Sequence, residues 1–440
     1  MATNLPCEFS LDLLICNREN TKKTLNIEPT GRICKRRQQI YSFIVDIEEI
    51  DITPFYWDIY VQTSNRGDLT TSRLVNDNYS VFKKLRHVGV RKAISTKNGE
   101  FIRYLYLTPS GGVSLVERKP SQYETSTYRL KEYTAFMFYH LFYKFLPKKT
   151  VWLVHEKYAN TAQDNGYYFF KYCYEKDPKK RVFYIIDRRS ADLKYLEKYQ
   201  SRTVYFMSFK HLLLLLEAKV IVSSEAKAHG YVWRTTHGIF RESLLNKRFV
   251  FLQHGVLGLK KVHSIFGANS VNKSNLFTVS SLKEKQIVKE YFGYKDDEII
   301  VTGLARWDEL FKEAPKRNSI REVLMLPTWR PWLDEVNQNT FETSVFFNAY
   351  RNLLQSDKLQ NLLDDYDVHL NFVVHPKLKN HLYSFKTNNS RLNFIELNKE
   401  RLISVIKRSD LLITDYSSVA WDMHYQSKPV LFYQLIKRNT

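Results

Sequence analysis

Short apolar segments of strand length recur from Thr150 to the end of the chain, and stretches of helical composition separate them. Such alternation favours parallel, doubly wound sheets. The first series of expected strands covers 151–154, 182–186, 204–206, 220–222, 249–252, 276–279 and 299–301, and the second covers 323–326, 370–374, 392–395, 411–413 and 430–432. We therefore expect an α/β fold with two Rossmann-like domains, residues 150–310 and 311–440, and a ligand cleft between them.

The first 120 residues follow a different pattern. Segments 40–46, 57–62 and 101–107 favour β structure, and Asn-Gly and Gly-Gly pairs mark turns in this region. Residues 1–120 are expected to form a small, β-rich, sandwich-like domain, and residues 121–149 a helical connection. The chain stops at Thr440, where a doubly wound domain would normally add a covering helix, so we expect the last domain to be truncated.

The chain is strongly basic, with 67 Lys and Arg against 46 Asp and Glu and a formal net charge of +21. An excess of this size attracts polyanions or an anionic membrane surface. No zinc-ligand spacing, RNP-like aromatic motif or helix-turn-helix signature is evident, so we expect no nucleic-acid partner. An anionic lipid face, an anionic polymer and a nucleotide-linked donor suit the charge equally well.

The four cysteines, at positions 7, 16, 34 and 173, have no paired spacing. This predicts neither a disulfide framework nor a metal site and fits a reducing cytoplasm. No secretory signal is evident, and no run of about 18 apolar residues could span a bilayer.

Residues 135–146 come closest to a membrane-active segment. Their aromatic density, with Tyr139, His140, Tyr143 and Lys144 interspersed, suits a helix lying among lipid headgroups. A core helix that packs two domains together is the alternative interpretation.

The expected strand 411–413 runs directly into Asp415, Ser417 and Ser418, where a helix should begin. Hydroxyl groups and free backbone N–H groups at a helix N-terminus offer donors to an anion, and the helix dipole adds a favourable field. An ordinary Ser or Asp N-cap explains the same residues. Three other strands also end in polar residues, and ligands collect at the carboxyl ends of strands in open α/β sheets, so we expect the motifs to face one crevice.

His254 follows one such strand, between Gln253 and Gly255. An imidazole there can take a proton from an attacking hydroxyl near neutral pH, and Gly255 permits close approach. Lys260 and Lys261 could neutralise phosphate. A structural histidine and a solvated basic face are the alternative interpretations, and the sequence shows no Asp or Glu that certainly orients His254.

The second series of strands offers further phosphate ligands. Pro376 biases His375 towards an extended conformation, which fixes an imidazole where it can donate to phosphate oxygens. Thr328 and Arg330 end another strand, and arginine presents a charged fork to a diphosphate.

The motif that contains Gly303, Arg306 and Asp308 falls at the expected domain junction. Arg306 paired with Asp308 is either a structural clasp or part of a donor pocket. We favour a structural role that affects function indirectly.

Taken in order, the motifs around His254, Arg306, Arg330, His375 and Ser418, with Lys428-Pro429 after them, resemble the CDP-glycerol glycerophosphotransferase family of teichoic-acid primases and polymerases. The resemblance covers roughly residues 150–440. A single tripeptide of this kind is weak, but five ordered motifs at strand ends are specific.

The resemblance implies a GT-B arrangement of the two Rossmann-like domains. It implies transfer of glycerol phosphate or ribitol phosphate from CDP-glycerol or CDP-ribitol to a hydroxyl of a lipid-linked teichoic-acid or capsule-like polymer, at the cytoplasmic face of the cell membrane. By the same resemblance His254 is the general base and His375 stabilises the donor phosphates. The residues that would help to hold the CDP portion are Thr328, Arg330, Asp415, Ser417 and Ser418.

In-line attack on phosphorus needs a deprotonated nucleophile and a stabilised leaving group. His254 would supply the first, and His375, Arg330 and Ser417 the second. No Asp-x-Asp element at a strand end calls for a metal, so we expect neither metal nor cofactor beyond the CDP-linked substrate.

Two other functions remain open from the sequence. A GT-B glycosyltransferase or epimerase that uses a UDP-sugar would share the architecture, and a non-enzymatic protein that binds a membrane surface or a polyanion would share the charge. Gln253 before the histidine and residues 256–259 after it depart from the family's common aromatic residue and proline, which leaves the acceptor and the polyol open.

Overall fold

The computed structural model describes residues 2–3, 10–18, 23–35, 38–65, 68–78, 80, 93–96, 99–108, 111–145, 150–232, 239–259, 262–270, 272–312, 319–328, 330, 333, 338–374, 384–385, 389–397 and 399–434. The chain divides into two compact units. Unit 1 comprises Met1–Thr134 and Val232–Glu242, and unit 2 comprises Ala135–Tyr231 and Ser243–Thr440.

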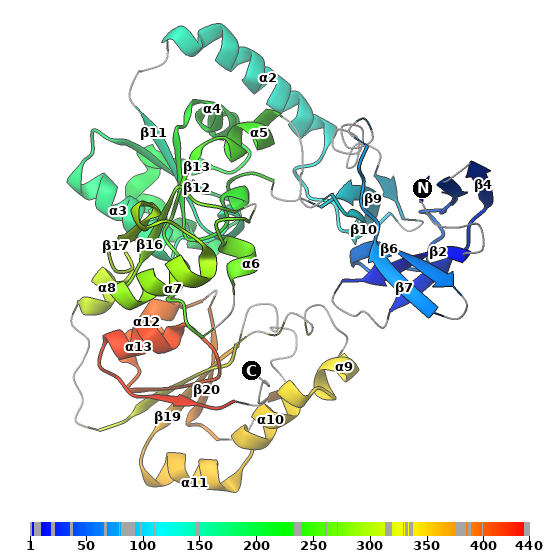
Figure 1. Ribbon diagram of the computed structural model, residues 1–440. Helices are drawn as coiled ribbons and strands as arrows, with labels where there is room; N and C mark the ends of the chain where they lie inside the picture. Colours follow the sequence, from blue (N-terminus) through cyan, green and yellow to red (C-terminus); the bar gives the residue numbers. More distant parts are fainter. Residues whose placement is uncertain are drawn as a thin grey trace. The chain divides into compact units, whose positions relative to one another are not determined.

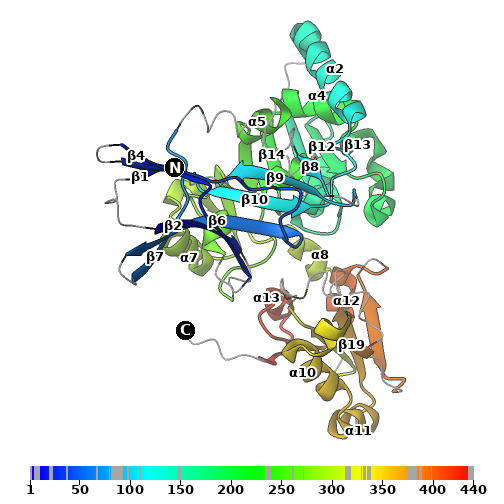
Figure 2. The same ribbon diagram turned by 90° about the vertical axis from the view of Figure 1, so that its right-hand side faces the viewer.

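Unit 1 is built from antiparallel strands (Figure 2). A small sheet has the order β1-β5-β4, and a larger one has the order β3-β2-β6-β10-β9-β8, with β7 also paired to β6. The strands are β1 (Ala2–Thr3), β2 (Ser10–Asn17), β3 (Thr24–Ile27), β4 (Gly31–Lys35), β5 (Gln38–Ser42), β6 (Phe55–Asn65), β7 (Asp68–Arg73), β8 (Ile94–Ser95), β9 (Ile102–Leu107) and β10 (Val113–Arg118).

Side chains alternate across the larger sheet, as the pleat of a strand requires. Trp57 and Ile59 of β6 pack with Leu13 and Ile15 of β2 and with Leu115 of β10, and these form the core of unit 1. The residues between them in sequence therefore lie on the opposite face of the sheet.

Helix α2 (Ser126–Phe142) and the short 3-10 helix η2 (Tyr143–Phe145) follow β10 and lie within residues 121–149, where a helical connection was predicted. The last turn of α2 carries His140, and Ala135 is buried. Across the residues that the structure describes, no helix combines the length and the apolar character needed to cross a membrane.

The first parallel sheet of unit 2 has the order β13-β12-β11-β14-β15-β16-β17 (Figure 1). The chain winds outward from β11 to β13 and then in the other direction from β14, so the winding reverses between β11 and β14. Each strand predicted in the first series overlaps one of these strands. They are β11 (Val151–His155), β12 (Arg181–Ile186), β13 (Thr203–Tyr205), β14 (Val220–Ser223), β15 (Arg248–Phe251), β16 (Leu276–Val279) and β17 (Ile299–Val301).

Helical segments connect these strands. Ser190, Ser208 and Ser281 begin three of them, and each serine side chain accepts a hydrogen bond from a backbone N–H of the first turn. The segments are η3 (Lys157–Ala159), α3 (Asn165–Lys176), η4 (Ala191–Arg202), α4 (Phe209–Glu217), η5 (Lys227–Gly230), α5 (Ile239–Leu245), α6 (His263–Phe266), α7 (Leu282–Phe292) and η6 (Asp296–Glu298).

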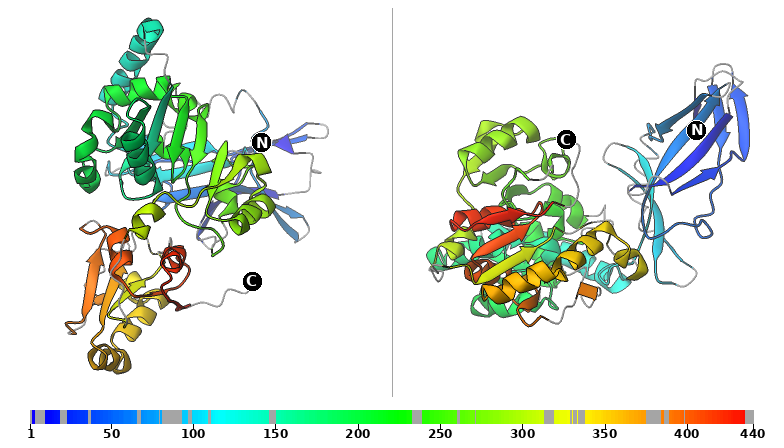
Figure 3. Two further views of the ribbon diagram at one scale, coloured as in Figure 1. Left: turned by 90° about the vertical axis from the view of Figure 1, so that its left-hand side faces the viewer. Right: turned by 90° about the horizontal axis from the view of Figure 1, so that it is seen from below.

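The second parallel sheet has the order β20-β19-β18-β21-β22, and Figure 3 shows it from two further sides in yellow, orange and red. Its winding reverses between β18 and β21, as in the first sheet. The strands are β18 (Glu322–Leu326), β19 (His369–Val374), β20 (Leu392–Glu396), β21 (Leu411–Thr414) and β22 (Val430–Phe432). The helices are α8 (Trp307–Phe311), α9 (Gln338–Glu342), α10 (Val345–Leu354), α11 (Asp357–Asp365), α12 (Leu402–Arg408) and α13 (Val419–Tyr425).

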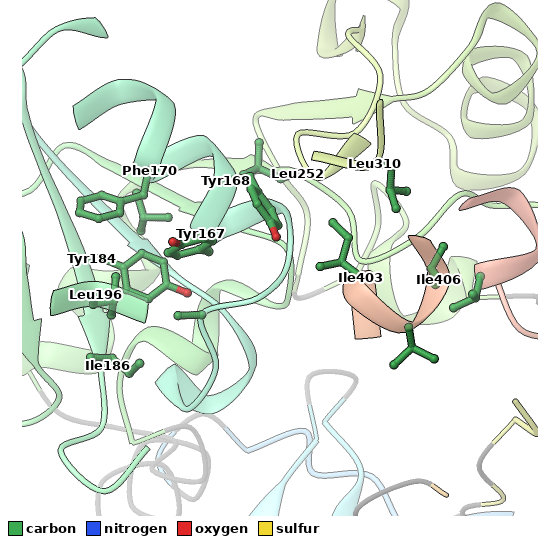
Figure 4. Packing of buried hydrophobic residues seen from close by; sticks show 14 of the residues in the cluster. Tyr167, Tyr168, Phe170, Tyr184, Ile186, Leu196, Leu252, Leu310, Ile403 and Ile406 are labelled. Atoms are coloured by element: carbon green, nitrogen blue, oxygen red, sulfur yellow. The ribbon is translucent and has the colours of Figure 1, made fainter. Parts of the chain in front are cut away.

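Both faces of the second sheet are covered, and its strands are accordingly rich in apolar residues. Val323 and Met325 of β18 pack with α10 and α11, whereas Leu324 between them packs with α12 and α13. The cluster that contains Leu324 continues to Tyr184 of the first sheet, and Figure 4 shows it from the α3 side to α12. Both parallel sheets of unit 2 therefore contribute to this one hydrophobic cluster.

The prediction of an α/β fold with parallel sheets is confirmed. The domain boundaries at 120, 149 and 310 and the truncation at Thr440 stay predictions.

Candidate active site

Three neighbouring strands of the first parallel sheet lead to the residues around His254. Strand β15 precedes His254 itself, and the acidic residues Asp164 and Glu225 follow β11 and β14. Parallel strands end at the same edge of a sheet, and this edge lies next to the reversal in winding. The topology thus unites residues that are far apart in sequence.

His254 is exposed over 66% of its side-chain surface. Its Nδ1 lies 2.8 Å from Asp164 Oδ2 and 3.7 Å from Glu225 Oε1. A carboxylate only accepts, so we assign the Nδ1 hydrogen to the bond with Asp164, which leaves Nε2 able to take a proton. Asp164 is also the N-cap residue of α3, yet its carboxylate makes no capping bond to that helix.

The charges around His254 set its protonation. Withdrawal from water lowers the pKa of His254, but Asp164 and then Glu225 outweigh this effect and raise the pKa to about 9. Burial would raise the pKa of Asp164, but His254 and Arg306 overcome it and hold that pKa below its ordinary value. At neutral pH the resting pair is therefore an imidazolium beside a carboxylate.

The backbone before His254 is unusual. Gln253 has a φ of 61°, in the left-handed region that non-glycine residues rarely adopt, and it is buried. Its Nε2 donates to the carbonyl of Thr278 at 2.6 Å, and its own carbonyl accepts from Asn165 Nδ2 at 2.8 Å. These bonds hold the strained turn that aims His254 away from the core.

A buried glutamate fixes the loop that carries Asp164. Glu156 directly follows β11 and accepts hydrogen bonds from the backbone N–H groups of Gln163 at 3.0 Å, Asp164 at 2.9 Å and Tyr167 at 2.8 Å. The Thr161 hydroxyl donates a fourth at 2.9 Å. Burial and then the charge of Asp164 raise the pKa of Glu156, and the hydrogen bonds from Gln163, Tyr167 and Thr161 oppose that rise.

Arg306 joins the loop of Asp164 to the second sheet. Its Nη1 donates to Asp164 Oδ1 at 3.0 Å and to the carbonyl of His254 at 2.9 Å. Its Nη2 donates to both carboxylate oxygens of Asp422 on α13, each at 2.9 Å. The guanidinium is largely buried, and its rigid fork suits this division between two carboxylates.

Two further contacts bring α13 to the site. Trp307 Nε1 donates to Asp422 Oδ1 at 2.6 Å, and the Trp307 ring stacks on Tyr425 with centroids 4.3 Å apart. At Gly255 an added Cβ would overlap Ser418 Oγ and lie 2.8 Å from Ser418 Cβ. The prediction that the motifs around His254 and Ser418 lie together is therefore confirmed, and only glycine fits at position 255 without displacement.

The predicted pairing of Arg306 with Asp308 is wrong. Arg306 binds Asp164 and Asp422, and Asp308 is exposed in the first turn of α8. Residues two apart on a helix do not face each other, so a guanidinium aimed at the sheet edge points away from Asp308. Gly303, just past β17, has a φ of 76° and turns the chain towards α8.

Asp415 and Arg330 form a buried ion pair at the carboxyl end of the second sheet. Arg330 Nη2 lies 2.6 Å from Asp415 Oδ2, and Arg330 Nη1 donates to the carbonyl of Thr328 at 2.9 Å. The Thr328 N–H donates to Asp415 Oδ1 at 2.8 Å. Asp415 has no exposed surface, so it holds two strand-end loops together rather than meeting a ligand.

Burial raises the pKa of Asp415, but the hydrogen bonds from Thr328 and Tyr416 and the charge of Arg330 outweigh burial, so the net change of the pKa is downward. The predicted open fork of Arg330 is instead engaged with this carboxylate, because a buried carboxylate needs a paired cation. Ser417 is nearly buried and accepts from the Val419 N–H, while Ser418 is the half-buried N-cap residue of α13.

Four predicted residues lie outside the described residues. They are His375 with its neighbour Pro376, and the pair Lys260 and Lys261.

A family model described as CDP-glycerol:poly(glycerophosphate) glycerophosphotransferase matches residues 135–436. The chain belongs to this family. The match begins inside α2 and runs through both parallel sheets, and it confirms the resemblance carried by the strand-end motifs.

The sequence is also similar to individual proteins of teichoic acid synthesis. It is 29% identical over 322 residues to the minor teichoic acid biosynthesis protein GgaB of Bacillus subtilis (strain 168), covering 70% of this chain and 34% of the relative. It is 24% identical over 291 residues to the teichoic acid ribitol-phosphate polymerase TarK of Staphylococcus aureus (strain NCTC 8325 / PS 47), covering 60% of this chain and 52% of the relative. The chain thus spans about a third and about a half of these relatives' lengths.

Among solved structures, one of the wall teichoic acid polymerase TagF aligns with a TM-score of 0.45 and 15% identity over 69% of this chain and 79% of that chain.

Sequence reasoning missed the acidic residues around His254 in this family member. Glu225 closely follows the predicted strand β14, so the rule that singled out His254 would have found it. Asp164 lies well past the end of β11, at the N-cap of α3, so the rule would not have found it. Asp422 could not be singled out in this way, because it lies inside α13. Which side of α13 faces the site depends on tertiary packing.

Proposed function

We propose that this chain transfers glycerol phosphate or ribitol phosphate from a CDP-linked donor to a hydroxyl of a lipid-linked teichoic-acid or capsule-like polymer. The observation that carries the proposal is an exposed His254 bound to Asp164 at the edge of a doubly wound sheet, in a chain of the glycerophosphotransferase family. The names of GgaB and TarK place those two proteins in teichoic acid synthesis.

His254 acts as the general base in this proposal. Nε2 removes the proton of the acceptor hydroxyl as its oxygen bonds to the phosphorus of the polyol phosphate, and the bond from that phosphorus to the bridging oxygen of the donor breaks. CMP leaves with both electrons of the broken bond. Asp164 accepts from Nδ1–H, so Nε2 is the nitrogen that loses and gains the proton, and the charge of Asp164 stabilises the imidazolium that forms.

The donor side is assigned to the second parallel sheet in a GT-B arrangement. Ser417, Ser418 and Thr328, together with His375, would bind the diphosphate, and Asp415 with Arg330 would position those loops without touching the donor. The contact of Gly255 with Ser418 supports this assignment, since it sets the predicted donor residues against the turn that carries the base. Arg306 would then hold the His254–Asp164 pair in a fixed position relative to α13.

CMP release from CDP-glycerol and CDP-ribitol, measured with a lipid-linked acceptor, tests this function. We expect acceptor-dependent release by the wild type that EDTA does not reduce, because the proposal includes no metal. His254→Ala should lower the rate at least ~100-fold, the usual contribution of a general base. His263→Ala, at an exposed histidine of α6, is the matched control and should keep the wild-type rate.

Release of UDP from a UDP-sugar in place of CMP would overturn the proposal, as would a folded wild type that turns over neither CDP-linked donor. Equal rates for His254→Ala and wild type would show that His254 is not the general base.

We also propose that the chain works as a peripheral protein at the cytoplasmic face of the cell membrane. Large apolar side chains of α2 and η2 are exposed rather than buried, and they recur every three or four residues. They are Leu130, Tyr133, Met137, Leu141 and Phe145.

This pattern reverses that of an ordinary surface helix, which turns its polar side to water. The small Ala135 is buried, whereas Leu141 is 69% exposed. An apolar stripe of this kind, on a chain with a net charge of +21, suits the boundary between acyl chains and anionic headgroups.

A further inference from the structure

The larger sheet of unit 1 carries a cluster of basic and aromatic side chains on the face opposite its core. We name it the tyrosine–arginine platform. It consists of Arg18, Tyr56, Asp58, Tyr60, Arg73, Tyr106 and Ser114.

The strand register explains how these residues meet. Ser114 of β10 lies opposite Asp58 of β6 on one side and opposite Tyr106 of β9 on the other, so the three form one row across the sheet. Tyr60 lies opposite Arg73 of β7 in the next row. Cross-strand neighbours on one face are close enough to interact directly.

A single carboxylate holds two guanidinium groups at the centre of the platform. Asp58 Oδ1 lies 2.6 Å from Arg18 Nη2, and Asp58 Oδ2 lies 2.6 Å from Arg73 Nη1. The Ser114 hydroxyl donates to Asp58 Oδ1 at 2.9 Å. Burial raises the pKa of Asp58, but these three partners lower it well below its ordinary value. The cluster therefore keeps a net positive charge, because two cations share one anion.

Tyrosine rings surround these cations. Arg18 lies over the ring of Tyr56 at 5.1 Å, and Arg73 lies over the ring of Tyr60 at 5.2 Å. Tyr106 meets Tyr56 edge to face, with centroids 5.9 Å apart, and its hydroxyl accepts from Arg18 Nη2 at 2.8 Å. The rings are half-buried and offer apolar faces beside the charge.

Arg18 is the accessible part of the platform. Its side chain is 39% exposed, and no hydrogen bond joins its Nη1 to any residue within the described ranges. Another ion pair on this face, Arg118 with Glu124, is buried and balanced. The uncompensated positive charge thus lies at Arg18 and Arg73.

We propose that the tyrosine–arginine platform binds the acceptor polymer, a chain of polyols linked by phosphodiesters. A phosphodiester would meet Arg18, while the carbon face of a polyol unit would pack on Tyr56 and Tyr106. Charge complementarity favours this occupant, since the platform is cationic and such a polymer carries one negative charge per repeat. The inference rests on the proposed function. In it, unit 1 binds the acceptor polymer while the polymer is extended.

Binding of a delipidated poly(glycerol phosphate) of defined length to the full chain, measured by calorimetry, tests the platform. Arg18→Gln should weaken binding roughly tenfold, as expected for one charge-assisted hydrogen bond. Asp58 keeps its bonds to Arg73 and Ser114 in this variant, so the sheet should stay folded. Tyr56→Ala should weaken binding as well.

Arg32→Gln is the matched control, because Arg32 is an exposed arginine of unit 1 that lies over Tyr41 in the small sheet. It should bind the polymer as the wild type does. Wild-type affinity in Arg18→Gln, or an equal loss in Arg32→Gln, would overturn the proposal. Equally tight, Arg18-dependent binding of single-stranded DNA of the same charge would overturn the choice of a polyol polymer.

CMP release with a monomeric acceptor separates this inference from the proposed function. The control variant Arg32→Gln should leave both that rate and polymer binding unchanged. A wild type that binds the polymer through Arg18 but releases no CMP would contradict the proposed function alone, since the calorimetric result does not depend on turnover.

Discussion

The protonation of His254 depends on two carboxylates, those of Asp164 and Glu225, and not on the strand that precedes the histidine. The sequence predicted the histidine because it ends a strand, but neither Asp164 nor Glu225 stands near it in sequence. Their positions follow from the winding order of the sheet, which places the ends of β11, β14 and β15 side by side. Arg330 and Asp415 were likewise found by pattern, but their burial and pairing depend on packing that no local pattern encodes.

The raised pKa of His254 predicts how activity depends on pH. A base must be unprotonated to act, and the pKa of about 9 means that its protonated form dominates below that pH. CMP release should therefore rise about tenfold per pH unit from pH 6 and level off near pH 9. Glu225→Gln removes one of the charges that raise the pKa of His254, so the midpoint of its rate profile should move to lower pH.

Rate profiles between pH 6 and 10 check this expectation. Asp296→Asn, at an exposed acid that pairs with Lys285 and Lys289, is the control and should keep the wild-type midpoint. A profile that falls from pH 6 upward, or a midpoint that Glu225→Gln leaves in place, would contradict His254 as the base.

The pair of His254 and Asp164 also makes the folding stability depend on pH. Protonated His254 is favoured in the folded chain, so its contribution is complete below the unfolded pKa of about 6.5 and is lost as pH rises through about 9. Asp164→Asn should flatten that part of the unfolding free energy measured against pH. An unchanged slope would show that the pair does not stabilise the folded state.

Arg306→Lys should damage both stability and activity. A lysine ammonium cannot serve Asp164 and Asp422 with one rigid fork, so a buried carboxylate loses its partner, at a cost of about 3–5 kcal/mol when such a pair is broken. Denaturant unfolding and CMP release measure the two effects. Arg321→Lys is the control, because the exposed pair of Arg321 with Asp367 should contribute no more than about 1 kcal/mol. Equal stability of the two variants would contradict the bridging role.

The strands of both parallel sheets could be read from the sequence, because strands covered on two faces are short, apolar runs bounded by polar turns. The antiparallel strands were located less well: the segment predicted from 40 to 46 is strand only to Ser42. Helix α2 was also predicted, but its outward apolar stripe required the structure, since apolar density alone fits a core helix equally well.

Charges placed on the exposed stripe of α2 should release the chain from lipid. The double variant Met137→Glu and Leu141→Glu adds two carboxylates where apolar side chains would enter the membrane, so co-sedimentation with vesicles rich in anionic lipid should fall at least ~10-fold. Ser126→Glu with Thr127→Glu adds the same charge at the start of the helix and should leave binding intact. Equal lipid binding by both double variants would contradict the membrane assignment. So would a wild-type dimer that dissociates in the first variant while lipid binding stays unchanged.

The net charge of the molecule limits the classes of partner that it can bind but does not identify the partner. A value of +21 suits a membrane surface, an anionic polymer and a nucleotide donor alike, and the ordered strand-end motifs were needed to choose among enzyme families. The role of unit 1 could not be read from the sequence, because the platform arises from register across strands β6, β7, β9 and β10.

Polyol-phosphate transfer is tested most directly by following both products of one reaction. CDP-glycerol and CDP-ribitol, each labelled in the polyol, would be supplied with a lipid-linked acceptor, and free CMP and polymer-bound label would be counted over time. We predict one CMP released for each polyol phosphate added to the polymer, with both products abolished together in His254→Ala. Release of CMP without label entering the polymer, or label transfer that persists in His254→Ala, would contradict the proposed transfer.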